Sequence, residues 1–126
     1  MITRGAYSKL NIHRGHQAPL AGLDGRDSFY QTNYLSNITP QKANLNSGSW
    51  RVLESRLRGI LEEETIRSVY VMTGPLYEKE MPSLPEADED HKIPNGYWKI
   101  VAIKKIVRFK RGHSFTVKIR PILLRC

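Results

Sequence analysis

The feature that most constrains this chain is an apolar stripe between residues 50 and 61. Its members are Trp50, Leu53, Leu57, Ile60 and Leu61. These positions share one face of a helix with 3.6 residues per turn. Asn46 or Ser47, just before the stripe, offers an N-cap. The sequence therefore predicts one main amphipathic helix over about 47–64.

Strand patterns are expected on both sides of that helix. Residues 68–73 and 97–103 are rich in β-formers, and Gly74-Pro75 is expected to end the first run. Weaker patterns predict extended segments at 8–16 and 33–41, with Pro40 limiting hydrogen bonding in the second. Residues 22–32 are predicted to form a loop, and 78–96, with three prolines and an acidic run, a surface excursion.

Length and composition indicate one domain at most. The chain has 126 residues, 40% of them hydrophobic and 25% charged, which is an ordinary soluble composition. Its apolar runs fall short of the ~20 residues that a membrane-spanning helix needs, so no membrane association is expected. The single cysteine, Cys126, excludes an intramolecular disulfide. Met1–Leu10 has no apolar core of a signal peptide, and localisation stays open.

The positive charge is concentrated at one end of the sequence. Residues 1–90 hold ten Lys/Arg and twelve Asp/Glu, whereas residues 91–126 hold ten Lys/Arg and no acid. A basic segment can bind phosphate backbones by releasing counterions, or it can simply be solvated. A hairpin around Lys110–His113 would fit the alternation of apolar and basic residues there.

A polar stretch from His13 to Glu54 carries residue types suited to phosphodiester hydrolysis. Histidine is a natural base near neutral pH, and the arginine fork matches phosphate oxygens. Hard divalent cations take oxygen ligands. On a strand, Arg14 and His16 would face the same side, and His13 the other, so the two histidines are not expected to share a metal.

The predicted helix would bring three more polar groups to this stretch. Asn46 stands at its expected start, where free N–H groups favour a phosphate. Glu54 lies about 12 Å further along the axis and about 80° round it, which favours help through water over shared ligation of one ion. Arg58 is one turn beyond Glu54 on the same face. Taken singly, each is more often a cap, a surface ion pair or a solvated side chain.

Several segments together carry a family resemblance. They are Arg14–Ala21, Asn33–Gln41, Leu45–Glu54, Val71–Glu78 and Ile93–Lys99. In order and spacing they resemble the DNA/RNA non-specific endonucleases, the ββα-metal nucleases of the Serratia nuclease and endonuclease G type. The resemblance spans about residues 10–103. It implies an α+β, ββα-metal (His-Me finger) fold with an antiparallel sheet and one main helix, incomplete relative to the family.

The resemblance implies an Mg²⁺-dependent endonuclease, with Mn²⁺ as an alternative ion, that cleaves DNA and RNA without sequence specificity. His16 resembles the general base that activates water. Asn46 resembles the one direct protein ligand of Mg²⁺, with waters in the other positions. Glu54 resembles a carboxylate that orients metal-bound water.

The remaining site residues resemble groups that hold the substrate or the site. Arg14 and Arg58 resemble the arginines that bind the phosphate and stabilise its transition state. Asn37, and more weakly Asn33, resemble polar residues that position the site. Such enzymes cut both DNA and RNA because they contact the backbone rather than the bases.

The sequence departs from the family in three respects. The family motif begins with Asp where this chain has His13. Family domains are about twice as long, and their upstream strands supply another arginine. The match is expected to stop at Ile103, which divides the chain into a partial endonuclease domain over residues 1–103 and a basic tail over 104–126. The alternative function is therefore an inactive family fragment that only binds nucleic acid.

Overall fold

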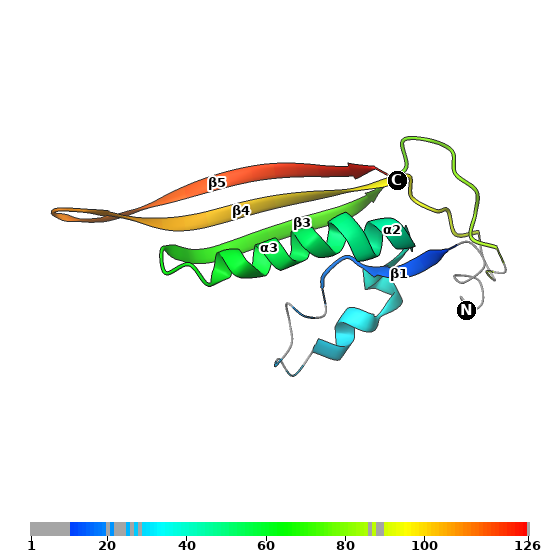
Figure 1. Cartoon of the computed structure of the whole chain (residues 1–126), viewed down its shortest axis with the longest axis horizontal. Helices are drawn as coiled ribbons and strands as arrows, with labels where there is room; N and C mark the ends of the chain where they lie inside the picture. Colours follow the sequence, from blue (N-terminus) through cyan, green and yellow to red (C-terminus); the bar gives the residue numbers. More distant parts are fainter. Residues whose placement is uncertain are drawn as a thin grey trace.

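The computed structural model describes residues 11–19, 21, 25, 27, 29–85, 87 and 90–125. Two antiparallel sheets and one long helix make up the fold (Figure 1). Strands β1 (Ile12–His16) and β2 (Ile38–Lys42) form the smaller sheet. Strands β3 (Ile66–Leu76), β4 (Gly96–Phe109) and β5 (Gly112–Arg125) form the larger one in that order. The predicted α+β class with an antiparallel sheet and one main helix is confirmed.

The smaller sheet agrees with the predicted extended segments only in part. Described β1 begins at Ile12, and residues 8–10 of the predicted strand lie outside the described part. In the segment 33–41, only residues 38–41 are extended, because two tight turns precede them. These are η2 (Phe29–Asn33) and η3 (Leu35–Asn37). Residues 22–24, 26 and 28 of the predicted loop also lie outside the described part.

The main helix begins earlier than predicted. It starts as α2 (Ala43–Leu45), continues through a π-type turn, η4 (Asn46–Trp50), and becomes α3 (Arg51–Leu61). Asn46 has helical φ −60° and ψ −47°, so the expectation that it caps the helix is wrong. Gly48, with φ −100° and ψ −112°, kinks the helix instead of standing in its first turn. The kink separates Asn46 from the regular helix that carries Glu54.

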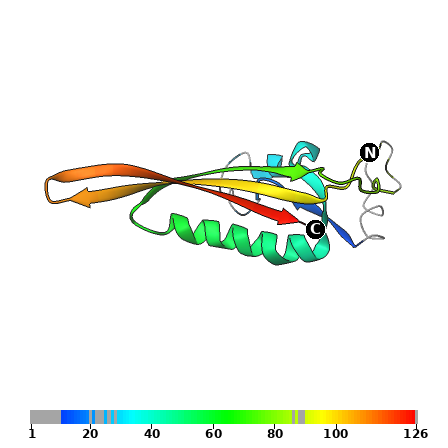
Figure 2. The same cartoon turned by 90° about the horizontal axis from the view of Figure 1, so that it is seen from above.

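Helix α3 covers one face of the larger sheet, as two perpendicular views show (Figures 1 and 2). Leu57 and Leu61 line a crevice together with Val69 and Val71 of β3. At the start of the helix Trp50 is buried against Leu45 and Tyr97. Trp50 is thus buried, Leu53, Leu57 and Ile60 are half-buried, and Leu61 is 57% exposed, so the predicted stripe packs against the sheet mainly at its N-terminal end.

Strand β3 continues through Gly74-Pro75 to Leu76, so the expected end at Gly74 is wrong. Gly74 lies opposite Trp98, and a Cβ there would come within 2.9 Å of the indole ring. The glycine therefore permits close packing rather than a turn. Pro75 is tolerated because β3 is an edge strand of its sheet.

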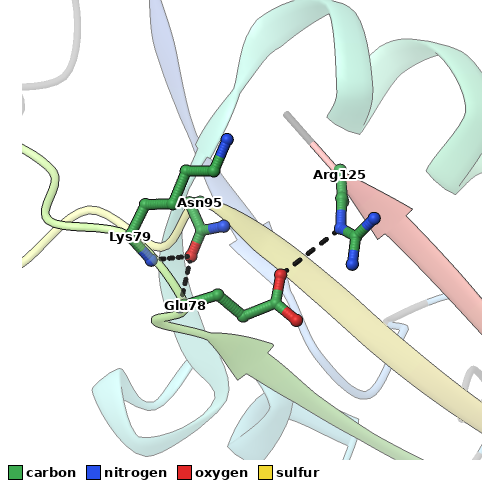
Figure 3. A network of polar contacts seen from close by, with 4 residues as sticks. All are labelled: Glu78, Lys79, Asn95 and Arg125. Carbon is green, nitrogen blue, oxygen red and sulfur yellow. Dashed lines mark hydrogen bonds and ion pairs between the residues drawn. The ribbon is translucent and has the colours of Figure 1, made fainter.

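The excursion between β3 and β4 is not only a surface loop. Leu84 and Ile93 are buried against Ile12 of β1. Asn95 Oδ1 accepts hydrogen bonds from the backbone N–H of Glu78 at 2.7 Å and of Lys79 at 3.4 Å. Glu78 also pairs with Arg125 at 3.3 Å (Figure 3). These contacts tie the end of β3 to the start of β4 and the end of β5.

Strands β4 and β5 form a long hairpin that turns at residues 110–111. The hairpin expected around Lys110–His113 is therefore confirmed. Its far part projects beyond the end of α3 (Figures 1 and 2). Arg108, Lys110 and Arg111 lie at its turn. Among the described residues, none of the helices is long and apolar enough to cross a membrane.

Candidate active site

Strand β1 and the kinked helix carry most of the residues proposed for the site. In β1, Arg14 is exposed and His16 is half-buried, and Gly15 between them is buried. A Cβ at Gly15 would overlap the side chain of Gln41 on β2, which is fully buried. Glycine therefore lets the two strands approach closely enough to hold the neighbouring side chains in place.

His16 is held by Asn33. Its Nε2 lies 3.0 Å from Asn33 Oδ1, at the end of turn η2. An amide oxygen accepts a hydrogen bond, so this pairing fixes the proton on Nε2 and leaves the lone pair on Nδ1. The structure thus brings together two residues that lie 17 positions apart in the sequence.

Asn37 holds the loop that follows His16. Its Oδ1 accepts a hydrogen bond from the Ala18 N–H at 2.8 Å, and its Nδ2 donates to the Ala18 carbonyl at 2.9 Å. The same Nδ2 donates to the Thr32 carbonyl at 2.8 Å. All the polar atoms of this side chain are therefore engaged in fixing backbone, which leaves Asn37 a positioning part.

Asn46 contacts His13 rather than His16. Asn46 Nδ2 lies 3.2 Å from His13 Nδ1, and Ser47 Oγ lies 3.5 Å from the same nitrogen. Since an amide nitrogen only donates, His13 Nδ1 is the acceptor and Asn46 Oδ1 stays available. Within the described part of the chain, no hydrogen bond joins Asn46 to His16. Sequence reasoning gave His13 no such part, because 33 residues separate it from Asn46.

Glu54 is a partly buried carboxylate with an unsatisfied oxygen. Its Oε1 is shielded from solvent and has no hydrogen-bond partner among the residues that the structure describes. Burial raises the pKa of Glu54 above its usual value of 4.5, while the positive charge of Lys99, the nearby Trp50 indole, Arg58 and His16 each lower it in part. Trp50 Nε1 itself makes no hydrogen bond of normal geometry, so its effect is that of a nearby dipole. An oxygen in this state is suited to accept from a ligand or a bound water.

Lys99 is the residue that sequence reasoning missed. It is 1% exposed, and its Nζ lies 4.1 Å from the centre of the Trp50 ring with no hydrogen-bond partner. Burial lowers the pKa of this ammonium group, and the Glu54 carboxylate raises it in part. The alternation Tyr97, Lys99, Val101 on β4 put this lysine on the buried face, which was the available signal.

The two arginines proposed to bind phosphate are not held by carboxylates. Arg14 is exposed and makes no hydrogen bond or ion pair with the residues the structure describes. Arg58 donates to Ser55 Oγ at 3.0 Å, and it acts on Glu54 through its charge and not through an ion pair. Both guanidinium groups therefore keep donors for an incoming anion.

Of the predicted site residues, Glu54 and Arg58 line a crevice of about 250 Å³ between the loop after β1, helix α3 and the larger sheet. Arg14, His16 and Asn46 are not among its lining residues. Its polar lining consists of Glu54, Arg58 and Lys99, and Ala18 and Pro19 close one side. The remaining lining is apolar. A phosphate entering here would meet two positive charges and one carboxylate at the end of an apolar groove.

The donor set fits a hydrated hard cation. The described residues contain no group of three or more His, Cys, Asp or Glu side chains that could enclose a metal. Mg²⁺ usually keeps several waters and takes only one or two protein ligands. The free Asn46 Oδ1 and the unsatisfied Glu54 Oε1 are oxygen donors of that kind.

Comparisons with known proteins point to one family of sequences. The sequence model of the DNA/RNA non-specific endonuclease family matches residues 2–114. The chain is 50% identical over 99 residues to the Nuclease of Serratia marcescens, covering 79% of this chain and 37% of that protein. It is 34% identical over 91 residues to human mitochondrial Endonuclease G, covering 71% of this chain and 28% of the relative. Mitochondrial Nuclease EXOG of Danio rerio is 36% identical over 92 residues.

The chain spans only a part of each relative. It covers 37% of the bacterial nuclease, 28% of human Endonuclease G and 24% of the fish Nuclease EXOG. The family match ends inside β5, at residue 114.

Proposed function

Because this chain belongs to the DNA/RNA non-specific endonuclease family, we propose that it hydrolyses phosphodiester bonds of DNA and RNA without sequence specificity. The partly buried Glu54 carries this proposal. Its unsatisfied oxygen lies beside a crevice that also contains Arg58 and Lys99, and His16 is near enough to act on its charge. That combination serves hydrolysis of an anionic substrate better than it serves packing.

His16 is the proposed general base. The Asn33 oxygen holds its Nε2–H, so the Nδ1 lone pair is free to take a proton from the attacking water. Asn33 acts as a positioning residue, because the hydrogen bond fixes both the tautomer and the ring plane. Asn37 supports the same geometry through its three hydrogen bonds to backbone groups.

Asn46 and Glu54 are the residues that would hold a hydrated Mg²⁺, with Mn²⁺ as the alternative ion. Such an ion supplies Lewis acidity toward the phosphate oxygens when it is bound. Asn46 offers its Oδ1, since His13 Nδ1 takes the amide N–H. Glu54 offers a carboxylate oxygen that lacks a hydrogen bond. A carboxylate placed to orient a bound water commonly accounts for a 10- to 100-fold effect on affinity or activity.

Two cationic side chains are proposed to stabilise the phosphate as negative charge accumulates on it, and a third acts through Glu54. Arg14 and Arg58 provide planar forks that match phosphate oxygens. Lys99 is too buried to reach solvent, so it acts chiefly by keeping Glu54 ionised. Its Nζ lies over the Trp50 ring, which holds the charge in place.

Plasmid nicking in Mg²⁺ and in EDTA tests this proposal. The expected result is nicking that requires the divalent ion and that His16→Ala lowers by about 10²- to 10⁴-fold, the range usual for a general base. His91→Ala is the matched control, because its backbone carbonyl accepts from the Leu84 N–H, and among the described residues its side chain makes no hydrogen bond. Nicking that is unchanged in His16→Ala would remove His16 as the base.

The second candidate function is an inactive fragment that binds nucleic acid. It is favoured by the basic hairpin and by His13 in the place where the family has Asp. Tight DNA binding in EDTA without any nicking in Mg²⁺ or Mn²⁺ would select this function over hydrolysis.

A further inference from the structure

A second basic pocket lies where β3 begins and the β4–β5 hairpin turns. It has a volume of about 320 Å³. Its lining residues are Arg67, Ile106, Arg108, Phe109, Gly112 and His113. Two guanidinium groups, an imidazole and an aromatic ring thus meet at the tip of the β4–β5 hairpin.

The strand register builds this pocket. Arg108 lies directly opposite His113, and Phe109 lies opposite Gly112 at the last pair before the turn. Arg67 comes from β3, at a register shift between Ile66 and Ser68 that re-aims its side chain. The Ile106 N–H donates to the Thr65 carbonyl at 2.8 Å and holds the two strands together at this point.

The positive charge of the pocket is not neutralised within the described part of the chain. Arg67 and Arg108 make no ion pair there, and the ion pairs of the larger sheet use other cations. Glu63 pairs with Lys105 at 3.4 Å, and Glu78 pairs with Arg125 at 3.3 Å. Lys110 and Arg111, in the adjoining turn, are both exposed. An anion entering the pocket would therefore meet two guanidinium groups that have no carboxylate partner among the described residues.

We propose that this pocket binds the phosphate backbone of a nucleic-acid strand, at a subsite separate from the cleavage site. Arg67 and Arg108 supply forked donors for phosphate oxygens. Phe109, which is 62% exposed, provides a face on which a base can stack. Binding there needs no base-specific contact, which agrees with a substrate recognised by its backbone.

The subsite lies far enough from the crevice to depend on substrate length. Lys99, beside Glu54, and Arg108 are nine residues apart on β4. At about 3.3 Å per residue this is about 30 Å. Nucleic acid advances about 3.4 Å per nucleotide of a duplex strand, so about nine nucleotides span the gap. A strand much shorter than this cannot contact Arg108 while it occupies the end of the crevice beside Lys99.

Binding in EDTA tests the subsite without requiring any cleavage. The probes are fluorescent 6- and 24-nucleotide single strands and a 24-base-pair duplex. Arg67→Ala/Arg108→Ala should weaken binding of the longer probes about 10-fold or more and reduce the salt slope by about 1.5, the value for two lost phosphate contacts. Phe109→Ala should weaken the single strand about 10-fold through lost stacking.

A charge-matched control separates this site from bulk charge. Lys79→Ala/Lys92→Ala removes the same charge from exposed positions of the excursion. Equal weakening by the control pair would overturn the proposal. So would binding to vesicles containing phosphatidylserine without binding to either longer probe, since the surface would then be a membrane contact. Circular dichroism and the urea midpoint confirm that each variant is folded.

The consequence for cleavage rests on the proposed function. On 24-nucleotide substrates the double variant should raise KM about 10-fold with kcat unchanged, and on 6-nucleotide substrates it should change neither. A lack of cleavage by the unmodified chain would count against the proposed function alone, because binding in EDTA is measured separately. Loss of kcat on the short substrates would overturn the subsite as a separate binding place.

Discussion

The region around β1 and the kinked helix differs sharply from the tip of the β4–β5 hairpin. In the first, polar side chains are fixed by partners distant in sequence, as in the pairs His16–Asn33 and His13–Asn46. In the second, charged and apolar side chains alike are exposed, and none of the β5 residues that the structure describes is fully buried. The side chains of the first region are held in fixed positions, whereas those of the second can mainly attract negatively charged groups.

This difference follows from packing. Trp50, Tyr97 and Lys99 are almost fully buried around Glu54, so the side chains of the crevice have few alternative rotamers. The hairpin tip has neighbours on only two strands and no helix over it (Figure 1). Cross-strand side-chain pairs therefore provide most of its stability, and its net charge can attract an anionic ligand. The first region is therefore suited to positioning the reacting groups, and the second to attracting an anionic substrate.

Stability provides the largest expected contrast. Trp50→Ala removes a ring that contacts Tyr97, at 5.4 Å between centroids, and Lys99. It should lower the free energy of unfolding by about 3–5 kcal/mol. Phe115→Ala on β5, 51% exposed, should lower it by less than about 1 kcal/mol. Urea unfolding measures both, and similar losses would contradict the contrast in packing.

Glu54→Gln tests the buried carboxylate. The expected fall in kcat/KM is about 10- to 100-fold. Burial raises the pKa of Glu54, so in the unmodified chain the ionised form is lost as pH falls through a value above 4.5. Activity should show an acidic limb in that range, and the limb should vanish in the variant. A limb that persists would assign it to another group.

Glu54→Gln should also change how the free energy of unfolding depends on pH. Ionisation of Glu54 favours activity but lowers stability. A raised pKa means that the folded state favours the neutral carboxyl, so this contribution is present below pH 4.5 and is lost as pH rises through the folded value. Urea unfolding between pH 4 and pH 7 should therefore show a smaller fall in stability for Glu54→Gln than for the unmodified chain. An unchanged pH dependence would contradict the assignment of burial as the main cause.

His13 offers a smaller, directed change. His13→Asp keeps an acceptor beside Asn46 Nδ2 and adds a negative charge, so Mn²⁺ binding should tighten several-fold. His13→Ala leaves the Asn46 amide without this partner and should weaken binding several-fold. Electron paramagnetic resonance of bound Mn²⁺ measures the affinity without turnover. Equal affinities in all three proteins would show that His13 does not orient Asn46.

The smallest effect is expected on the apolar face of the hairpin. Ile119 is 65% exposed on β5. Ile119→Thr keeps β-branching and should change the free energy of unfolding by less than about 0.5 kcal/mol, with nicking unchanged. A loss above 2 kcal/mol would mean that this face is covered in solution and that the hairpin is not an open arm.

Local patterns predicted the parts of the fold that local forces decide. The stripe from Trp50 to Leu61 identified the helix, and the Lys110–His113 turn identified the hairpin, because side-chain period and turn chemistry act over a few residues. The end of β3 was misplaced at Gly74 because this glycine is required by close packing against Trp98 on the next strand and not by a turn. The start of the helix was misplaced because Gly48 allows a kink inside it.

The candidate site shows the same limit more clearly. The residue types around Arg14-Gly15-His16 pointed to phosphate chemistry, and the family resemblance supplied their roles, which stay predictions. Their partners were not predictable, because the pairs that matter join residues 17 and 33 positions apart. Lys99 was missed because a buried lysine is rare, and its role can be recognised only once it is known to lie beside Glu54.

Measuring both kcat and Kd for two variants tests most directly whether cleavage and binding at the hairpin pocket belong to separate regions. His16→Ala and Arg67→Ala/Arg108→Ala are compared on one 24-nucleotide substrate, with Kd measured in EDTA and kcat in Mg²⁺. We expect His16→Ala to lower kcat by about 10²-fold or more with Kd within twofold. We expect the double variant to raise Kd and to leave kcat unchanged. Parallel losses of kcat and Kd in both variants would contradict this separation.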